Sequence, residues 1–495
     1  MAAACSPTGP APASTQLAAG VTDAPTGLAS APPDSTVDPG SSPIIDPGPT
    51  IEPTTEPTTE PILPSPDPGP TTGPELPTGI QPGVVDRASL DVSATYRINA
   101  TITVSTGALD VTTRIEATNR SGSGIDRLEL NTIAARLGGI RVTNATVDDV
   151  PVHVAIKDQT LLVPLAGILP DGNTATVTIS YRATLRKGVA GFDWMFTRSG
   201  GTLALYRWIP WVSAAVPFDR PNSGEPFVRP TSPQVDVEIL TDEPMILAAP
   251  AADIAAYAAG PGNDWAFSLK NVRDVSVVLA PDFRVTKANV DGVPIKAYTR
   301  PGGLSGAQLI EQAGSAMSNA TDLLGVAYPW TTLSIVETPG GDGIESPGLI
   351  WIPHRLDLRN RTYALYHEVA NQWFAGLVGN NQRSEPFADG APADLLARTS
   401  LGTLRATRCP RAALDRSIAS YSHLCYYEVV FVQGGRLLDD LRRRLGTNTF
   451  WKAMGSYLEA NRYGMGGTKA LLDALRKASP VNLLPLIRPR FPSLY

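Results

Sequence analysis

The stretch YALYHEVANQWFAGLVGNNQRSEPFADGAPADLLA, residues 363–397, decides how the second half of the chain folds. Apolar residues recur in it every three or four positions, which predicts a helix with Trp373 in the core. The same helix carries His367, Glu368 and Asn371. Residues four apart share a helix face, so a histidine at 371 would set two imidazoles against one metal ion, with the glutamate activating bound water. Asn371 stands there instead, so the pattern is that of a metal-binding helix with one ligand replaced.

Composition limits the classes of protein that this chain can belong to. With 495 residues, of which 42% are hydrophobic, it can bury a large core spread over about two or three domains. The net charge is −6 and only 18% of residues are charged, which argues against a nucleic-acid partner because phosphates require a basic surface. No run of about 18 apolar residues occurs, so the sequence predicts no membrane-spanning helix.

The N-terminus has a composition of its own. Cys5 follows three alanines and precedes a Pro/Thr/Ser tract, an arrangement similar to the processing box of a bacterial lipoprotein, although the basic and apolar parts of a signal peptide are absent. From Ser6 to about Gly83 the chain is rich in proline, threonine and acidic residues, which predicts a disordered, semi-extended tether over residues 1–84. A lipid anchor at Cys5 would put the protein outside the cell or on the cell envelope. The alternative is an incidental cysteine in a disordered tail.

Two periodicities divide the rest of the chain. Alternation with period two, as in ATYRINATITV, LDVTTRIEATN, TATVTISYRATL and QVDVEIL, predicts a large antiparallel β domain over residues 85–290. Beyond RPGGLSG the period lengthens: AQLIEQAGSAMSNATDLLG predicts a helix, TTLSIVET a strand, and helices dominate from Asn360 onward. The second domain, residues 291–495, is therefore predicted to be mostly helical with a small α/β start. The fold class is multidomain α+β.

Four segments in order resemble the membrane-alanyl-aminopeptidase family of zinc metallopeptidases, the gluzincin aminopeptidases. HEVANQWFAGLVGNNQRSEPFADGAPADLLA aligns without a gap with H-E-x-x-H-Q-W-F/W-x-G-L-V-G-N-D-x-x-x-x-P-W-L-D-E-G-x-A-E-x-L-A. GDGIESPGLIWIP looks like the Gly-x-Met-Glu segment, YYEVVFVQGGRLLDDLRRRLG like V-Y-x-K-G-A-x-x-L-x-x-L-R-x-x-L-G, and NVRDVSVVLAPDF like the end of the N-terminal domain. The resemblance implies a saddle-like N-terminal β domain followed by a thermolysin-like peptidase domain.

The resemblance also assigns a role to each site position. It places Glu345 where relatives hold the free α-amine of the substrate, His367 as the first zinc ligand and Glu368 as the general base. The second and third ligand positions are Asn371 and Gly390, and Phe431 stands at the position of the catalytic tyrosine. An amide oxygen is a poor zinc ligand, glycine has no side chain, and phenylalanine lacks the hydroxyl.

These losses decide the functional expectation. Removing a group that merely supports a metal ligand costs about 10–100-fold in affinity or activity, and here two of the three ligands themselves are replaced. An oxyanion donor of the kind that Phe431 lacks contributes on the order of 10²–10³ in rate. The resemblance therefore implies a pseudopeptidase with no bound cofactor, where active relatives hold zinc. A rebuilt metal site of His367, Asp389 and His354 is the alternative, although His354, like the strand residue His153, has a structural role as its simpler interpretation.

Three functions remain open at this stage. The first is an extracellular protein that uses the old peptidase cleft, with Glu345 able to pair with an amine, to bind a peptide or protein without cutting it. The second is a working zinc aminopeptidase with a rearranged metal site. The third is an envelope scaffold with a vestigial cleft. Cys409 and Cys425 are sixteen residues apart, and either a disulfide or two reduced, packed cysteines fit an exported protein.

Overall fold

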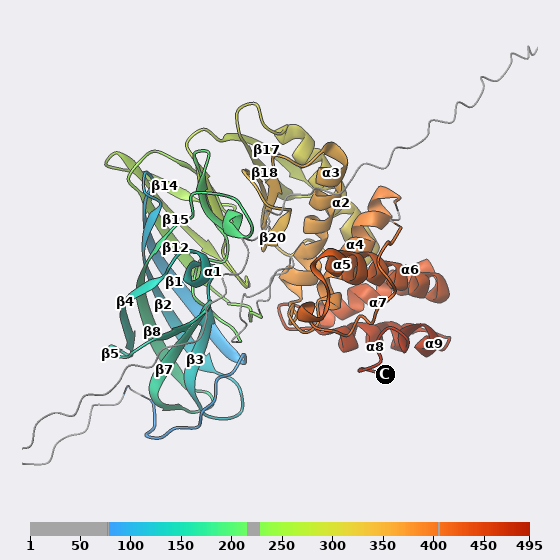
Figure 1. Cartoon of the computed structure of the whole chain (residues 1–495), viewed down its shortest axis with the longest axis horizontal. Helices are drawn as coiled ribbons and strands as arrows, with labels where there is room; N and C mark the ends of the chain where they lie inside the picture. The colour runs from blue at the N-terminus through green and yellow to red at the C-terminus, as the bar shows by residue number, and fades with distance from the viewer. Residues whose placement is uncertain (1–76, 78, 215–227, 404–405) are drawn as a thin grey trace, which may run out of the picture. The chain divides into compact units, whose positions relative to one another are not determined.

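The computed structural model describes residues 77, 79–214, 228–403 and 406–495 (Figure 1). The predicted Cys5 anchor and most of the predicted tether lie outside these residues. The folded part begins before the predicted boundary at residue 85, because Gln81 exchanges two backbone hydrogen bonds of 2.8 Å with Ile168, and Ile80 is buried. Among the described residues, no helix is both long and apolar enough to cross a membrane.

A β-rich region comes first, as the alternation predicts. Its largest sheet has eight strands in the order β14-β15-β12-β1-β2-β8-β4-β5. Along β1, Val92–Thr103, every second side chain is buried, which is the pattern of a strand with one face on the core. The strands are β14 (Ala255–Ala259), β15 (Gly262–Leu269), β12 (Val235–Thr241), β2 (Ala108–Asn119), β8 (Thr174–Thr184), β4 (Arg141–Val147) and β5 (Val150–Pro151).

Two four-stranded sheets complete the β-rich region. One has the order β11-β3-β7-β6 and the other β13-β16-β10-β9. Their strands are β11 (Trp211–Val212), β3 (Ile125–Asn131), β7 (Thr160–Leu169), β6 (Ala155–Lys157), β13 (Ile246–Ala248), β16 (Val277–Ala280), β10 (Thr202–Leu205) and β9 (Phe196–Ser199). A short helix, α1 (Ile133–Leu137), follows β3. His153 lies in the exposed link between β5 and β6, so its predicted place in a strand is wrong.

The prediction of an antiparallel domain holds for all but one strand pair of these sheets. β1 pairs with β2 in the antiparallel sense but with β12 in the parallel sense, from Tyr96 opposite Val235 to Ile102 opposite Thr241. Figure 1 shows these long strands side by side in the β-rich region. The result is a β-rich region whose largest sheet is mixed.

A five-stranded sheet opens the second region, in the order β17-β18-β19-β21-β20. Its strands are β17 (Arg284–Val290), β18 (Val293–Thr299), β19 (Leu333–Thr338), β20 (Ile344–Ser346) and β21 (Leu349–Pro353). β18, β19 and β21 are parallel neighbours, and α2 (Gly306–Leu324) is the crossover between the first two. Since β17 pairs with β18, this sheet begins at Arg284, within the segment predicted to belong to the β domain.

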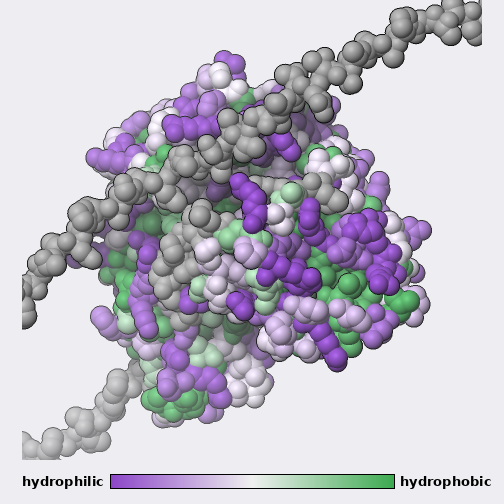
Figure 2. Space-filling view, turned by 45° about the vertical axis from the view of Figure 1, so that its right-hand side comes forward, coloured by the Kyte–Doolittle hydropathy of each residue, from purple (hydrophilic) through white to green (hydrophobic). Residues whose placement is uncertain are grey.

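Helices make up the rest of the chain, as predicted. Two of them run directly into π-helical turns: α3 (Leu358–Asn371) continues as Gln372–Leu377, and α5 (His423–Tyr427) continues as Glu428–Gln433. The others are α4 (Phe387–Leu401), α6 (Gly434–Leu445), α7 (Thr447–Ala460), α8 (Thr468–Ala478) and α9 (Leu484–Ile487). Trp373 and Phe374 are fully buried in the helical core, as their spacing predicts. Figure 2 shows hydrophilic residues over much of one face, with apolar patches among them.

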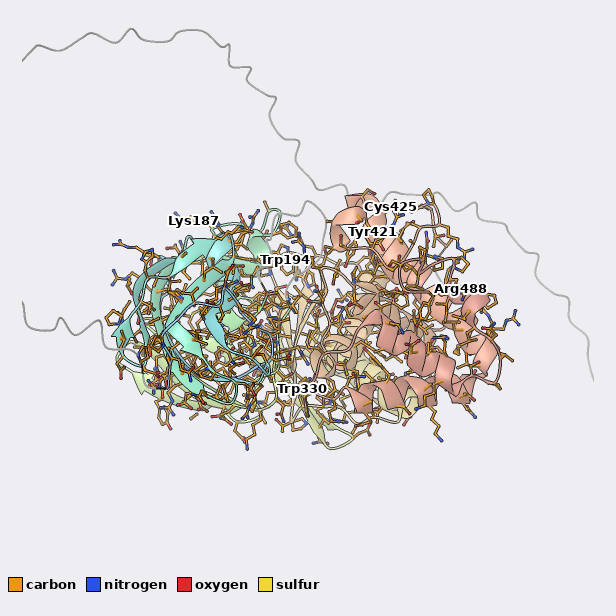
Figure 3. The ribbon with its side chains drawn as sticks, turned by 90° about the horizontal axis from the view of Figure 1, so that it is seen from below. Lys187, Trp194, Trp330, Tyr421, Cys425 and Arg488 are labelled. Atoms are coloured by element: carbon orange, nitrogen blue, oxygen red, sulfur yellow. A yellow bond between two sulfur atoms is a disulfide. The ribbon has the colours of Figure 1, made fainter. Side chains whose placement is uncertain are left out.

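Cys409 and Cys425 form a disulfide, with Cα atoms 5.8 Å apart. Figure 3 shows Cys425 and Tyr421 near each other on the helical region. Within the loop that the bridge closes, the N–H of Leu414 donates to the carbonyl of Arg490 at 2.7 Å. The bridge therefore holds a loop that is itself bonded to the C-terminal segment.

Candidate functional site

The predicted site residues lie where β20 and the last turn of α3 meet. Glu345 is the central residue of β20, while His367, Glu368 and Asn371 occupy the C-terminal end of α3. Asp357 starts this helix by accepting a hydrogen bond from the N–H of Asn360 at 3.0 Å. The three α3 residues are each 6% exposed, so the polar face of α3 is turned inward.

The Asn371 side chain bonds to both glutamates. Its Nδ2 donates to Glu368 Oε2 at 3.1 Å and to Glu345 Oε2 at 3.4 Å. Carboxylate oxygens accept these bonds, and the amide turns its NH₂ group toward both glutamates. Asn371 Oδ1 is buried without a hydrogen-bond partner among the described residues. The side chain at the second ligand position therefore presents a donor to the carboxylates, whereas a metal requires an acceptor.

The Phe431 ring lies against the space that a side chain on residue 390 would enter. A Cβ atom on Gly390 would lie 3.0 Å from Cζ of Phe431 and 3.1 and 3.2 Å from its Cε atoms, closer than nearly all such contacts. Gly390 is in α4, and Phe431 is in the π-helical turn that follows α5. The ring at the position of the family's tyrosine thus fills the space that a side chain at the third ligand position would need.

His367 is surrounded by aromatic rings. Its ring centroid lies 5.3 Å from that of Phe431 and 5.7 Å from that of Tyr363. Burial, with the nearby Arg398 guanidinium adding to it, lowers the pKa of His367 to about 3, so the imidazole is neutral at pH 7. Its Nδ1 is buried without a hydrogen-bond partner among the described residues.

The alternative ligands do not gather around His367. Asp389 accepts hydrogen bonds from Asn380 Nδ2 at 3.2 Å, from Gln382 Nε2 at 2.9 Å and from the N–H of Gly390 at 2.9 Å. Nδ1 of His354 lies 2.6 Å from Oε1 of Glu337, in a separate cavity after β21. The rebuilt site of His367, Asp389 and His354 is therefore not assembled.

A zinc ion does not fit the residues of this site. Zinc in proteins of this class needs two imidazoles, a carboxylate and a water in tetrahedral positions. Here one imidazole remains, the second position offers an amide donor and the third is blocked by a ring. Within the described ranges, no three His, Cys, Asp or Glu side chains are grouped so that they could hold a metal ion.

Sequence reasoning missed a buried charge cluster from the β-rich region that borders Glu345. Arg207 Nη2 lies 3.6 Å from Glu345 Oε1, and Arg207 and Arg229 both pair with Asp274, at 3.8 and 2.8 Å. Burial raises the pKa of Glu345, and the Arg207 guanidinium opposes that rise. Charged residues inside the apolar runs LYRWIPW and VRDVSVV were the available signal, because a charge in such a run is buried only when it is paired.

Asp389 gives this site a testable pH dependence. Burial raises its pKa from the ordinary 3.8 to about 6, so the folded protein keeps the proton to higher pH than the unfolded chain. The contribution of this group to stability is complete below pH 4 and is lost as pH rises through 6. Asp389→Asn cannot ionise, and we expect it to gain about 2–3 kcal/mol relative to the wild type between pH 4 and pH 7 in urea unfolding. The exposed Asp253→Asn is the control, and equal gains in the two variants would contradict the expectation.

Comparisons with known proteins find a relative in sequence and solved structures with the same fold. No protein-family model matches the sequence. Over 239 residues the chain is 24% identical to an alanine/arginine aminopeptidase from Saccharomyces cerevisiae, a match that covers 41% of this chain and 28% of that protein. An M1 zinc metallopeptidase mutant from Deinococcus radiodurans has the same fold, with a TM-score of 0.64 at 17% identity over 83% of this chain and 96% of that one.

Two further structures of the Deinococcus radiodurans protein agree. The mutant described as bound to a Tyr-Ser-Ala substrate gives a TM-score of 0.64 at 17% identity, and the M1 zinc metallopeptidase itself gives 0.63 at 18%. They cover 83% and 78% of this chain, and 95% and 91% of their own. The chain therefore shares its fold with M1 zinc metallopeptidases, and part of its sequence is similar to that of an alanine/arginine aminopeptidase.

Proposed function

We propose that this chain is a pseudopeptidase of the M1 type, an extracellular or envelope-attached protein that binds peptides or proteins without hydrolysing them and without zinc. One observation carries the proposal: the Phe431 ring fills the third ligand position while the Asn371 amide donates to the glutamates. From the similarity of fold we also propose that the first domain is saddle-like and that the second domain is thermolysin-like.

Glu345 and Glu368 are the binding groups in this proposal. Both carboxylates accept from the single amide nitrogen of Asn371, so they lie close enough together for one ammonium group to bridge them. Glu345 is the more accessible, with 12% of its side chain exposed. A peptide's free α-amine supplies three donors and one positive charge, which suits two facing carboxylates. In this proposal the amine is held, and no metal-bound water stands ready to attack the peptide bond.

The test measures zinc, turnover and binding on the full chain. We expect well under one zinc per chain by elemental mass spectrometry after dialysis against trace metal, and no chelator-sensitive hydrolysis of aminoacyl reporter substrates. In calorimetry, a tripeptide with a free N-terminus should bind at least about tenfold more tightly than its acetylated form, since an ion pair is lost on acetylation. Glu345→Gln should abolish that preference, while the exposed Glu238→Gln should keep it.

Each other outcome favours one of the alternatives. A stoichiometry near one zinc with chelator-sensitive hydrolysis would replace the proposal with an active, rearranged aminopeptidase. A metal-free, folded protein that binds neither tripeptide would replace it with a scaffold whose old site is vestigial.

A further inference from the structure

A cavity of about 320 Å³ lies apart from the His367 site, at one edge of the five-stranded sheet. Its walls include the residues that follow three parallel neighbours: Arg300 after β18, Thr338 at the end of β19, and His354 and Arg355 after β21. Gly200, from the turn between β9 and β10, closes one side. Open α/β sheets place their ligands at the carboxyl ends of parallel strands, because the loops there diverge to leave a crevice.

His354 is held in a fixed orientation on the wall of this cavity. Its Nδ1 lies 2.6 Å from Oε1 of Glu337, a carboxylate that is almost completely buried and also accepts from the N–H groups of Arg300 and Leu304, each at 3.0 Å. A carboxylate that accepts at Nδ1 fixes the ring and directs Nε2 outward. Half of the His354 side chain is exposed, and its Nε2 has no partner among the described residues.

Of the two arginines that line the cavity, Arg355 is the one without an ion-pair partner among the described residues. Arg300 is paired with Asp282, Nε to Oδ1 at 2.8 Å, and also donates to the carbonyl of Gly200 at 2.9 Å, so this guanidinium is engaged in holding the wall. Glu337 is satisfied by its three donors. Arg355 is exposed, lines the cavity and has no ion-pair partner within the described ranges.

A long helix begins just after one of these loops and adds to the positive potential. α2 starts at Gly306, after the loop that contains Arg300, and its N-cap is the uncharged Ser305. The N-terminus of a helix carries a partial positive charge, so α2 favours an anion at this edge of the sheet, whereas the N-terminus of α3 is already capped by the Asp357 carboxylate.

We propose that this cavity is a second binding site, which takes a small organic molecule through an oxyanion, a carboxylate or a phosphate. In its doubly protonated form the His354 ring donates to Glu337 through Nδ1 and to the oxyanion through Nε2, and the Arg355 guanidinium supplies a further positive charge. Glu337 is the positioning residue that orients the imidazole. The site is independent of the proposed peptide binding, because none of the residues that line the cavity belongs to the His367 site.

The experiment follows the histidines of the full chain by NMR during titration with inorganic phosphate. The chain has four histidines, so selective labelling at Cε1 gives four resonances at most. We expect phosphate to shift one of them in a saturable way, and His354→Asn should remove that resonance. Arg355→Gln should weaken phosphate binding at least about tenfold, because a charged hydrogen bond is lost.

The exposed Arg359→Gln is the matched control and should change the affinity less than about twofold, because Arg359 does not line the cavity. A parallel titration with succinate distinguishes the two oxyanions, since tighter succinate binding at the same resonance identifies a carboxylate ligand. The proposal is overturned if neither anion shifts the His354 resonance, or if Arg359→Gln weakens binding as much as Arg355→Gln does.

Discussion

Replacing Arg273 with methionine is expected to lower the free energy of unfolding by about 4 kcal/mol. The Arg273 guanidinium reaches from the β-rich region to carbonyl oxygens on the helical side: Gly376 at 2.8 Å, Leu377 at 3.3 Å and Gly464 at 2.9 Å, as well as Arg229 at 2.8 Å. The residue is only 4% exposed, so methionine would leave the Gly376 and Arg229 carbonyls without this buried donor, while the Leu377 and Gly464 carbonyls would each keep one backbone N–H, from Tyr463 and Gly379. The midpoint and slope of urea unfolding of the full chain measure the loss.

The control for this prediction is an arginine whose ion pair is open to solvent. Arg182 pairs with Asp110 on the sheet surface and is 67% exposed, so Arg182→Met should cost less than about 1 kcal/mol. If Arg273→Met also cost less than 1 kcal/mol, water would be satisfying the carbonyls and Arg273 would not be what links the two regions.

Replacing Gly390 with glutamate, the residue that the family carries there, is expected to cost about 4 kcal/mol rather than to restore a metal site. Any side chain at 390 meets the Phe431 ring within 3.2 Å of its Cβ, and Gly390 is buried, so a glutamate carboxylate there would be removed from water. Overpacking and the burial of a charge both destabilise the folded state. Gly188→Glu is the control, because a Cβ there meets nothing within 4 Å.

A double-mutant cycle assigns this cost to the ring. Phe431→Ala by itself should destabilise the protein by about 3 kcal/mol through the cavity that it leaves. Gly390→Glu should then cost at least about 2 kcal/mol less in the Phe431→Ala background than in the wild type, since the overlap is gone. Additive losses would show that the two positions do not compete for space.

The sequence predicts local structure well where one periodicity applies over the whole element. The predicted helix beginning at Ala307 matches α2, and the predicted strand around Leu333–Thr338 matches β19. Pairing partners are a different matter, because alternation marks a strand without naming its neighbour. This is why alternation does not predict the parallel pairing of β1 with β12, and why the predicted β domain includes β17, which pairs with β18.

In the candidate site, too, local spacing predicts some features, whereas contacts between residues far apart in the sequence are not predicted. Spacing alone puts His367 and Asn371 on one face of a helix, and α3 places them so. The contact between Gly390 and Phe431 joins residues 41 positions apart through two helices, and no local pattern encodes it. The hydrogen bonds that Asp389 accepts from Asn380 and Gln382 depend on how the segment before α4 folds back on that helix, and no local pattern predicts them.

The pairing of Gln81 with Ile168 determines how the folded part would respond to a pull applied at its first residues. Tension entering at residue 79 would first break that pair and then the three hydrogen bonds that the backbone at 85–87 donates to Asp126. The next element, β1, is bonded to β2 on one side and β12 on the other along most of its length. Pulling β1 out of the sheet would break its hydrogen bonds to β2 and to β12 at the same time. We therefore expect the contacts before β1 to break at low force and the eight-stranded sheet to resist a higher force.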